Sequence, residues 1–300
     1  MLSAVTQRVI DCAGKPLDLS QPRVMGILNV TPDSFSDGGN YLAAEHALEH
    51  AARMVEEGAA IIDVGGESTR PGAAEVTVEE ELQRVIPVIE ALNAALDVPV
   101  SIDTRKPGVM QAAVAAGAGL INDVTALQAP GASELAAQLG VPVCLMHMQG
   151  TPESMQDQPT YGNVVTEVKD FLLERAGACM QHGIDRENIL LDPGFGFGKT
   201  PAHNLQLLQQ LEQLVEAGFP VLVGLSRKSM IGQILGLPVD KRLPAGLALA
   251  VLAAWQGAAI VRCHDVRETR EAILMCQAVR DADQGQRQDF TKPSFPPARE

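Results

Sequence analysis

Apolar and polar positions fall into blocks along the chain. Eight short runs are apolar almost throughout, and each is followed by a segment whose apolar residues recur every three or four positions. An unbroken apolar run is typical of a strand buried on both faces, as in a parallel sheet under helices, and the longer recurrence is typical of an amphipathic helix. The expected strands span residues 23–30, 59–66, 98–103, 119–124, 141–147, 188–194, 220–226 and 258–264.

Eight strand–helix units within about 260 residues predict an α/β fold of the (β/α)₈ TIM barrel type. An open doubly wound sheet is the alternative, but it needs a glycine-rich dinucleotide fingerprint after its first strand, where this chain has "NVTPDSFSDGG". The segment "RVIDCAGKPLDL" predicts a β-hairpin around Gly14–Lys15 that closes the bottom of the barrel. We expect one barrel domain over residues 1–282 and a flexible polar tail over 283–300, which is rich in proline.

Composition and charge narrow the class of protein. The net charge is −14 with a pI near 4.9, which argues against nonspecific binding to nucleic acid or an anionic membrane, because both select basic surfaces. The five cysteines are scattered and never form a C-x-x-C pair, which indicates free thiols in a reducing compartment. The N-terminus lacks a signal-peptide pattern and no stretch approaches eighteen apolar residues, so we expect a cytoplasmic protein.

Polar residues finish nearly every expected strand. The active site of such a barrel lies at the carboxyl ends of its strands, so these positions are the candidates for chemistry. A single aspartate there is as often a helix N-cap as a functional group, but caps do not explain a ring that also includes lysine and two arginines. The ring consists of Asn29, Asp63 followed by Glu67, Ser68, Thr69 and Arg70, then Asp103, Asn122, Asp123, His147, Asp192, Ser226, Arg227, Lys228, Arg262 and His264.

Residue chemistry divides this ring in two. Asp103, Asn122 and Asp192 can exchange hydrogen bonds with a flat heterocycle; Asp192 could accept two N–H bonds from a guanidine-like edge while Lys228 donates to a carbonyl. A separate cationic rim is suited to phosphate groups and a magnesium ion. This rim would consist of Arg262, His264, Asn29 and Arg70.

Two members of the ring keep alternative interpretations. Asp63 is a candidate metal ligand or a residue that supports one. His147 ends the fifth strand, where a structural hydrogen bond and a substrate contact are equally compatible with the sequence. In contrast, His46 and His50 are expected on a solvated helix face, because "HALEH" is not a metalloprotease-type H-E-x-x-H motif.

The stretch "LDPGFGFGKT" superficially resembles a phosphate-binding loop. Pro193 stands where the first glycine of that motif would be, and proline has no N–H to donate. We therefore interpret the stretch differently: its glycines allow a sharp turn and a close approach to a bound ring. Lys199 and Thr200 then lead into the next helix, with Thr200 as the N-cap before Pro201.

Two long loops follow the first two strands. The segments "TPDSFSDGGNY" and "ESTRPGAAEVT" are rich in Gly, Pro, Ser and Thr, a composition typical of mobile loops that cover active sites. We expect both to help form the binding site.

Eight motifs in the same order make the sequence resemble the dihydropteroate synthase family of folate biosynthesis. The resemblance covers about residues 23–282, and so many ordered motifs are far more specific than a single glycine pattern. The motifs are "MGILNVTPDSFSDGG", "IIDVGGESTRPGA", "SIDT", "INDV", "CLMHMQG", "LLDPGFGFGK", "GLSRKSMIG" and "RCHDV".

The resemblance implies a transferase that joins 6-hydroxymethyl-7,8-dihydropterin diphosphate to p-aminobenzoate, giving 7,8-dihydropteroate and pyrophosphate. It implies a pterin pocket of Asp103, Asn122, Asp192 and Lys228, and a pyrophosphate region of Asn29, Arg70, Arg262 and His264, with Asn29 as ligand of Mg²⁺. Around p-aminobenzoate it implies Thr69, Arg70, Pro71, Phe197, Lys228 and Ser229. The catalytic groups would be Arg262, His264, Lys228 and Asp103.

The same resemblance implies a homodimer through the later helices and inhibition by sulfonamides. It also implies departure of pyrophosphate before the arylamine attacks, so no general base is assigned. Two alternatives differ in function. A methyltransferase that serves a corrinoid partner would not need the cationic rim, and a noncatalytic pterin-binding relative would be expected to have lost the loop motifs.

Overall fold

The computed structural model describes residues 8–30, 39–68, 75–151, 155 and 157–282, and eight parallel strands form a barrel within it. In sheet order they are β8 (Ile189–Asp192), β7 (Val143–Met146), β6 (Leu120–Asp123), β5 (Val100–Asp103), β4 (Ile61–Gly65), β3 (Arg23–Asn29), β10 (Ile260–Cys263) and β9 (Leu222–Gly224). A parallel bridge between Leu191 and Val221 joins the two ends of the sheet. The predicted (β/α)₈ barrel is confirmed.

The expected runs are longer than the strands, because apolar residues continue into buried backbone on either side of the paired segment. The run over 220–226, for example, contains only three strand residues in β9, although Val221 and Leu225 are also buried. Apolar patterning therefore locates each strand but does not fix its ends.

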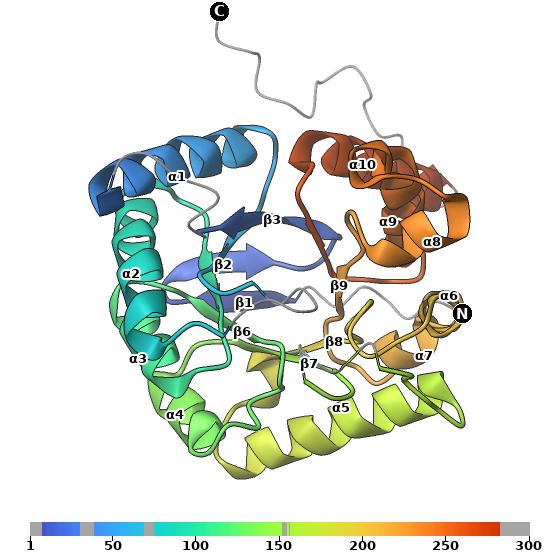
Figure 1. Ribbon diagram of the computed structural model, residues 1–300, viewed down its shortest axis with the longest axis horizontal. Coiled ribbons are helices and arrows are strands. Elements are labelled where there is room, and N and C mark those ends of the chain that lie inside the picture. The colour runs from blue at the N-terminus through green and yellow to red at the C-terminus, as the bar shows by residue number, and fades with distance from the viewer. Residues whose placement is uncertain (1–7, 31–38, 69–74, 152–154, 156, 283–300) are drawn as a thin grey trace, which may run out of the picture.

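Helices cover the outside of the barrel, as Figure 1 shows. Thr200 accepts a hydrogen bond from His203 N and Pro201 is the first helical residue, so the predicted N-cap is confirmed. The helices are α1 (Gly39–Glu56), α2 (Val78–Ala95), α3 (Pro107–Ala115), α4 (Ala132–Leu139), α5 (Val164–Gln181), α6 (Pro201–Gln209), α7 (Glu212–Val215), α8 (Ser229–Leu235), α9 (Leu243–Trp255) and α10 (Val266–Asp281), with 3-10 turns at Arg186–Asn188 and Val239–Lys241.

The predicted hairpin closes the barrel at the amino ends of the strands. It consists of β1 (Val9–Cys12) and β2 (Lys15–Asp18), and its turn is Ala13–Gly14 rather than Gly14–Lys15. Its buried side chains pack with the first residues of several barrel strands. A Cβ on Gly119 would lie 2.4 Å from Cys12 O, so only glycine allows the hairpin this close to β6.

The core between barrel and helices is built mainly from Ala, Val, Ile and Leu. None of the helices in the described part of the chain is long and apolar enough to cross a membrane. The tail over 283–300 lies outside the described residues.

Candidate active site

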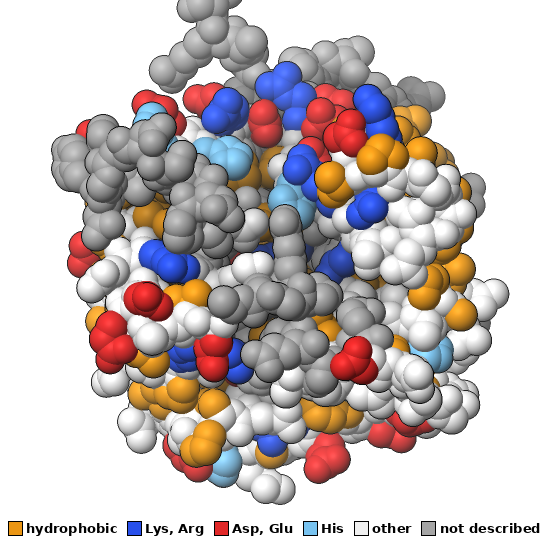
Figure 2. Space-filling view, viewed as in Figure 1, with side chains coloured by type: hydrophobic (Ala, Val, Ile, Leu, Met, Phe, Trp, Pro, Cys, Tyr) orange, Lys and Arg blue, Asp and Glu red, His pale blue; other side chains and the backbone are white. Residues whose placement is uncertain are grey.

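The charged strand-end residues converge at one end of the barrel. On the face viewed in Figure 2, Lys and Arg side chains (blue) and His side chains (pale blue) lie around the middle. Asp63, Asn122 and Asp192 are buried. Removing these polar groups from water costs free energy, which hydrogen bonds and ion pairs must offset.

Arg262 lies at the centre of this arrangement. Its Nε donates to Asp63 Oδ2 at 2.6 Å and its Nη2 donates to Asp103 Oδ2 at 2.9 Å. Asn122 Nδ2 donates to the same oxygen of Asp63 at 3.2 Å. The expected separation into a heterocycle pocket and a distinct cationic rim is therefore wrong for Arg262, since its long side chain reaches back among the carboxylates.

The charge states follow from burial and from these contacts. Burial lowers the pKa of Arg262, but Asp63 and Asp103 outweigh it and raise the pKa above its ordinary value, so the guanidinium stays cationic. Burial raises the pKa of Asp103 to about 7; Arg262 opposes that rise and Asp63 adds to it. The Asp103 carboxylate is therefore easier to protonate than that of an exposed aspartate.

Asp192 and Lys228 form the second charged pair of the site. Asp192 ends β8 and its Oδ1 accepts a hydrogen bond from Gly194 N at 2.7 Å. Burial raises the pKa of Asp192 to about 6, and burial lowers the pKa of Lys228 to about 8. Each charge favours the other, so at pH 7 both groups are ionised.

Phe197 lies under Lys228. The ammonium nitrogen is 4.3 Å from the centre of the Phe197 ring, a cation–π distance. A Cβ on Gly196 would lie 3.2 Å from Lys228 Cδ, so the bare backbone there leaves room for the lysine stem. Ser229, the first residue of α8, is exposed beside them.

The glycine-rich turn after β8 packs on the segment after β7. Gly194 has φ +67° and Gly198 has φ +62°, and a Cβ on them would lie 1.9 Å from His147 O and 2.4 Å from Gln149 O. We expected these glycines to allow approach to a ligand; what they allow here is contact with a neighbouring loop. Lys199 leads into α6 as expected, and its side chain is buried beneath this turn.

His264 is held by the segment that follows β9. Ser226 Oγ lies 3.0 Å from His264 Nδ1 and also accepts from His264 N. Arg227, with φ +57°, makes two hydrogen bonds to Asp265, at 2.6 and 3.2 Å. Arg242 donates to Arg227 O. These contacts fix the backbone from which Lys228 and His264 project.

His46 and His50 are exposed on α1, as predicted. They line an open cavity of about 520 Å³ whose wall also includes His264, Arg53 and Glu49. The cavity lies between α1 and the start of α10, so it borders the side of the site to which His264 belongs.

Asn29 and Asp103 lie on either side of Gly65. In the sheet register Asn29 pairs with Gly65 and Gly65 pairs with Asp103. A Cβ on Gly65 would lie 3.8 Å from both Asn29 Oδ1 and Asp103 Oδ2. Thr69, Arg70 and Pro71 lie outside the described residues.

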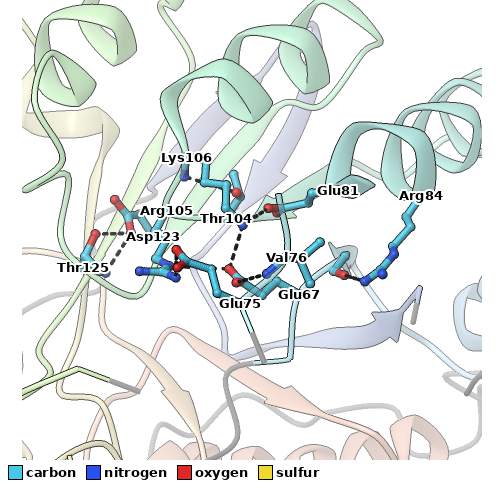
Figure 3. Close-up of polar contacts among 11 residues, drawn as sticks. Glu67, Glu75, Val76, Glu81, Arg84, Thr104, Arg105, Lys106, Asp123 and Thr125 are labelled. Atoms are coloured by element: carbon cyan, nitrogen blue, oxygen red, sulfur yellow. Dashed lines mark hydrogen bonds and ion pairs between the residues drawn. The ribbon is translucent and has the colours of Figure 1, made fainter. Parts of the chain in front are cut away.

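An ion-pair network that sequence reasoning missed lies behind the ends of β4 and β5 (Figure 3). Glu67 accepts hydrogen bonds from Val76 N at 3.1 Å and from Lys106 Nζ at 3.0 Å. Lys106 also donates to the fully buried Glu81, at 2.6 Å. Arg105 donates to Glu75 at 2.8 Å. The network ties residues on both sides of segment 69–74 to the start of α3.

Comparison with known proteins identifies the class. The pterin binding enzyme family matches residues 25–264, a range that contains every strand-end residue described above, from Asn29 to His264. The chain belongs to the pterin-binding enzymes.

Individual relatives narrow this class further. The chain is 55% identical over 274 residues to the dihydropteroate synthase of Escherichia coli strain K12, covering 91% of this chain and 97% of the relative. A Xanthomonas albilineans dihydropteroate synthase with 4-aminobenzoic acid superposes with a TM-score of 0.86 at 55% identity, covering 92% of this chain and 99% of that one. A Yersinia pestis dihydropteroate synthase in complex with a sulfonamide drug superposes with a TM-score of 0.87 at 54% identity, covering 91% and 99%. Within its class, this chain is a member of the dihydropteroate synthase family, whose members are transferases of folate biosynthesis.

Proposed function

We propose that this barrel end joins 6-hydroxymethyl-7,8-dihydropterin diphosphate to p-aminobenzoate, with the pterin held by Asp192 and Lys228. The observation that carries the proposal is this pair of opposite charges, a buried carboxylate and a half-buried ammonium, whose charges also act on the cluster of Arg262 and Asp103. A pterin presents N–H donors and a carbonyl acceptor on one flat edge, which matches a carboxylate beside an ammonium.

The pocket supplies hydrogen bonds on two sides of the heterocycle. Asp192 has one oxygen committed to Gly194 N, and its other oxygen and remaining lone pairs accept from the pterin edge. Lys228 donates to the pterin carbonyl. Asp103 and Asn122 serve the opposite side of the ring, because both belong to neighbouring strands, β5 and β6.

The reaction exchanges one bond at the methylene carbon. The C–O bond to the diphosphate breaks and its electron pair leaves with the diphosphate oxygen; the arylamine nitrogen then forms the C–N bond and releases a proton to solvent. Arg262 and His264 stabilise the negative charge that develops on the leaving group. The arylamine is neutral at pH 7, so no buried base is required.

The residues present fit a magnesium ion that is bound mostly by the substrate. In the described part of the chain, no three His, Cys, Asp or Glu side chains form a metal-binding group, which does not suit a cage made only of protein ligands. Mg²⁺ commonly keeps several waters and binds one or two protein oxygens plus substrate phosphates. Asn29 would supply an oxygen at the end of β3, and the ion would neutralise charge on the diphosphate.

The arylamine would lie outside the pterin, against Phe197 and Ser229. Thr69, Arg70 and Pro71 are proposed to complete this site. A sulfonamide resembles p-aminobenzoate in shape and charge, so it should compete there.

We further propose that the protein is a cytoplasmic homodimer. Helix α9, "LPAGLALAVLAAW", has no charged residue and leaves Leu252 and Trp255 exposed, while neighbouring α10 exposes Met275 and Val279. An apolar surface that spans two helices is typical of a subunit interface. The scattered, buried free cysteines support a reducing compartment. The net negative charge argues against binding to nucleic acid or to anionic membranes.

Pyrophosphate release tests the proposed function. Purified protein should release pyrophosphate in stoichiometric amounts with 7,8-dihydropteroate only when the pterin diphosphate, p-aminobenzoate and Mg²⁺ are all present. Binding of the pterin without pyrophosphate release on adding the arylamine would overturn it, and methyl transfer to a corrinoid would identify the alternative methyltransferase. Asp192→Ala should abolish pterin binding; near-normal affinity would remove Asp192 from the pocket.

A further inference from the structure

Lys199 is a buried amine that the proposed chemistry does not use, and burial lowers the pKa of its ammonium group to about 7. Its side chain lies beneath the turn after β8, and the residue is only 2% exposed. Its Nζ donates to Gly194 O at 3.0 Å, to Phe197 O at 3.0 Å and to His147 O at 3.2 Å. The same nitrogen lies 2.9 Å from His147 Nδ1, so these four acceptors share at most three N–H bonds. One ammonium thus gathers acceptors from two separate loops.

The imidazole of His147 is an acceptor in this contact. Burial and the neighbouring Lys199 charge lower the pKa of His147 to about 3, so the ring is neutral. With Lys199 donating to Nδ1, the ring proton belongs on Nε2. The ring packs edge-on against Phe171, with ring centres 4.9 Å apart. His147 therefore has the structural hydrogen bond that the sequence left open as one of two interpretations.

The turn that Lys199 holds carries residues of the pterin pocket. Gly194 O accepts a hydrogen bond from Lys199 Nζ, while Gly194 N donates to Asp192 Oδ1. Phe197 O accepts a hydrogen bond from Lys199 Nζ, while the centre of the Phe197 ring lies 4.3 Å from Lys228 Nζ. Displacing this turn would therefore move both the carboxylate and the ammonium that recognise the pterin edge.

Two other side chains, Tyr161 and Asn204, also contact this glycine-rich segment. Tyr161 donates to Gly198 O at 2.7 Å, and Asn204 Oδ1 accepts from Gly196 N at 2.8 Å. Neither contact reaches the carbonyl groups of Gly194 and Phe197, which both accept from Lys199; Gly194 O also accepts from Phe197 N at 3.1 Å. Without the Lys199 side chain, each of these two carbonyl groups would lose a donor, and the turn would be held less firmly.

We propose that Lys199 is a positioning residue for pterin recognition, acting through the turn 194–197 on Asp192 and Lys228. The inference rests on the proposed function, because it takes the pterin to be the ligand of that pair. The competing interpretation is a lysine that stabilises the barrel and has no effect on recognition.

The test compares pterin affinity with thermal stability. Lys199→Met removes the donors at similar volume, and Lys199→Gln keeps two of them. Arg186→Met is the matched control: Arg186 precedes the opposite, amino end of β8, where it donates to Ala217 O at 3.0 Å and lies over Phe219. The probe is 6-hydroxymethylpterin without phosphate, measured by calorimetry on the intact protein alongside pyrophosphate release.

We expect Lys199→Met to raise the Kd for this probe at least tenfold and Lys199→Gln to raise it at least threefold. Arg186→Met should lower the melting temperature and leave the Kd unchanged. If either folded Lys199 variant binds the probe within twofold of wild type, the positioning role is wrong and the lysine is purely structural; if the Met variant does not fold, the Gln variant decides. Failure of wild type to release pyrophosphate would instead refute the proposed function, independently of these ratios.

Discussion

Arg262 Nε lies 2.6 Å from Asp63 Oδ2 across the top of the barrel, although the two residues are 199 positions apart in the chain. Asp63 is fully buried and Arg262 is largely so. The pair joins β4 to β10, with β3 between them. It orients the guanidinium that also contacts Asp103.

Replacing Asp63 by alanine should destabilise the protein strongly. Removing one partner of a buried pair leaves the other charge uncompensated, which costs about 3 kcal/mol or more. Activity should fall as well, because Arg262 and Asn122 both lose the oxygen that positions them. Chemical denaturation measures the free energy of unfolding.

Asp18→Ala is the control for this experiment. Asp18 pairs with Arg23 at 2.8 Å near the surface, with 44% of its side chain exposed. Exposed pairs contribute under about 1 kcal/mol. If Asp63→Ala and Asp18→Ala lowered the free energy of unfolding equally, the buried pair would contribute no more to stability than the exposed one.

Pterin affinity should follow a bell-shaped pH profile. The pKa of Asp192 is raised to about 6, so its carboxylate forms only above that pH; the pKa of Lys228 is lowered to about 8, so its ammonium is lost above that pH. Binding that needs both charges is strongest between about pH 6 and pH 8 and weakens on either side. The Kd of 6-hydroxymethylpterin, which carries no phosphate, reports this across pH 5 to 9. Asp192→Asn should flatten the acidic limb; a flat wild-type profile would contradict the assignment.

Local sequence signals predicted much of this structure. The N-cap at Thr200 depends only on residues 200–203, and each strand corresponds to an apolar run, so both could be predicted from the sequence. The position of Asp192 at a strand end followed from the barrel itself. These features depend on neighbours in the chain, which the sequence displays directly.

Contacts between side chains far apart in the chain could not be predicted from local sequence signals. The sequence predicts that Lys199 leads into α6, and it does. The sequence does not show which carbonyl groups surround the Lys199 side chain, because they belong to a turn whose path depends on Gly194 and Gly198 packing on another loop. Arg262 was placed on a rim because nothing local shows that it reaches Asp63. Charge type was predictable, but the side of the site to which each long side chain extends was not.

Lys106→Met should destabilise the protein by about 3 kcal/mol, because Glu81 would remain fully buried without its cation. Glu67 would also lose a donor, although Val76 N and Arg105 remain. Unfolding in denaturant measures the loss. Lys241→Met provides the comparison, since Lys241 and Asp240 form a mostly exposed pair; a Lys106 variant as stable as this one would show that the network contributes little.

Leu252→Arg should convert the proposed dimer to a monomer. The substitution places a charge in the middle of the apolar α9 surface, and burying an unpaired charge at an interface is unfavourable. Light scattering coupled to size exclusion measures the mass. Leu205→Arg adds the same charge on α6, where Leu205 is exposed, and should leave the mass unchanged. A wild-type protein that stays monomeric at micromolar concentration would refute the dimer.

Chelation of Mg²⁺ should abolish pyrophosphate release while leaving binding of the phosphate-free pterin intact. The two effects separate because the ion is proposed to lie between Asn29 and the diphosphate, whereas the heterocycle is recognised by Asp192 and Lys228. Asn29→Ala should raise the Mg²⁺ concentration needed for half-maximal rate several-fold without changing the Kd of 6-hydroxymethylpterin. Titrating Mg²⁺ in the pyrophosphate assay, with calorimetry on the pterin alone, measures both quantities. If Asn29→Ala weakens the pterin alone as much as it shifts the Mg²⁺ requirement, Asn29 acts on the heterocycle through its neighbour Asp103, which lies on the other side of Gly65.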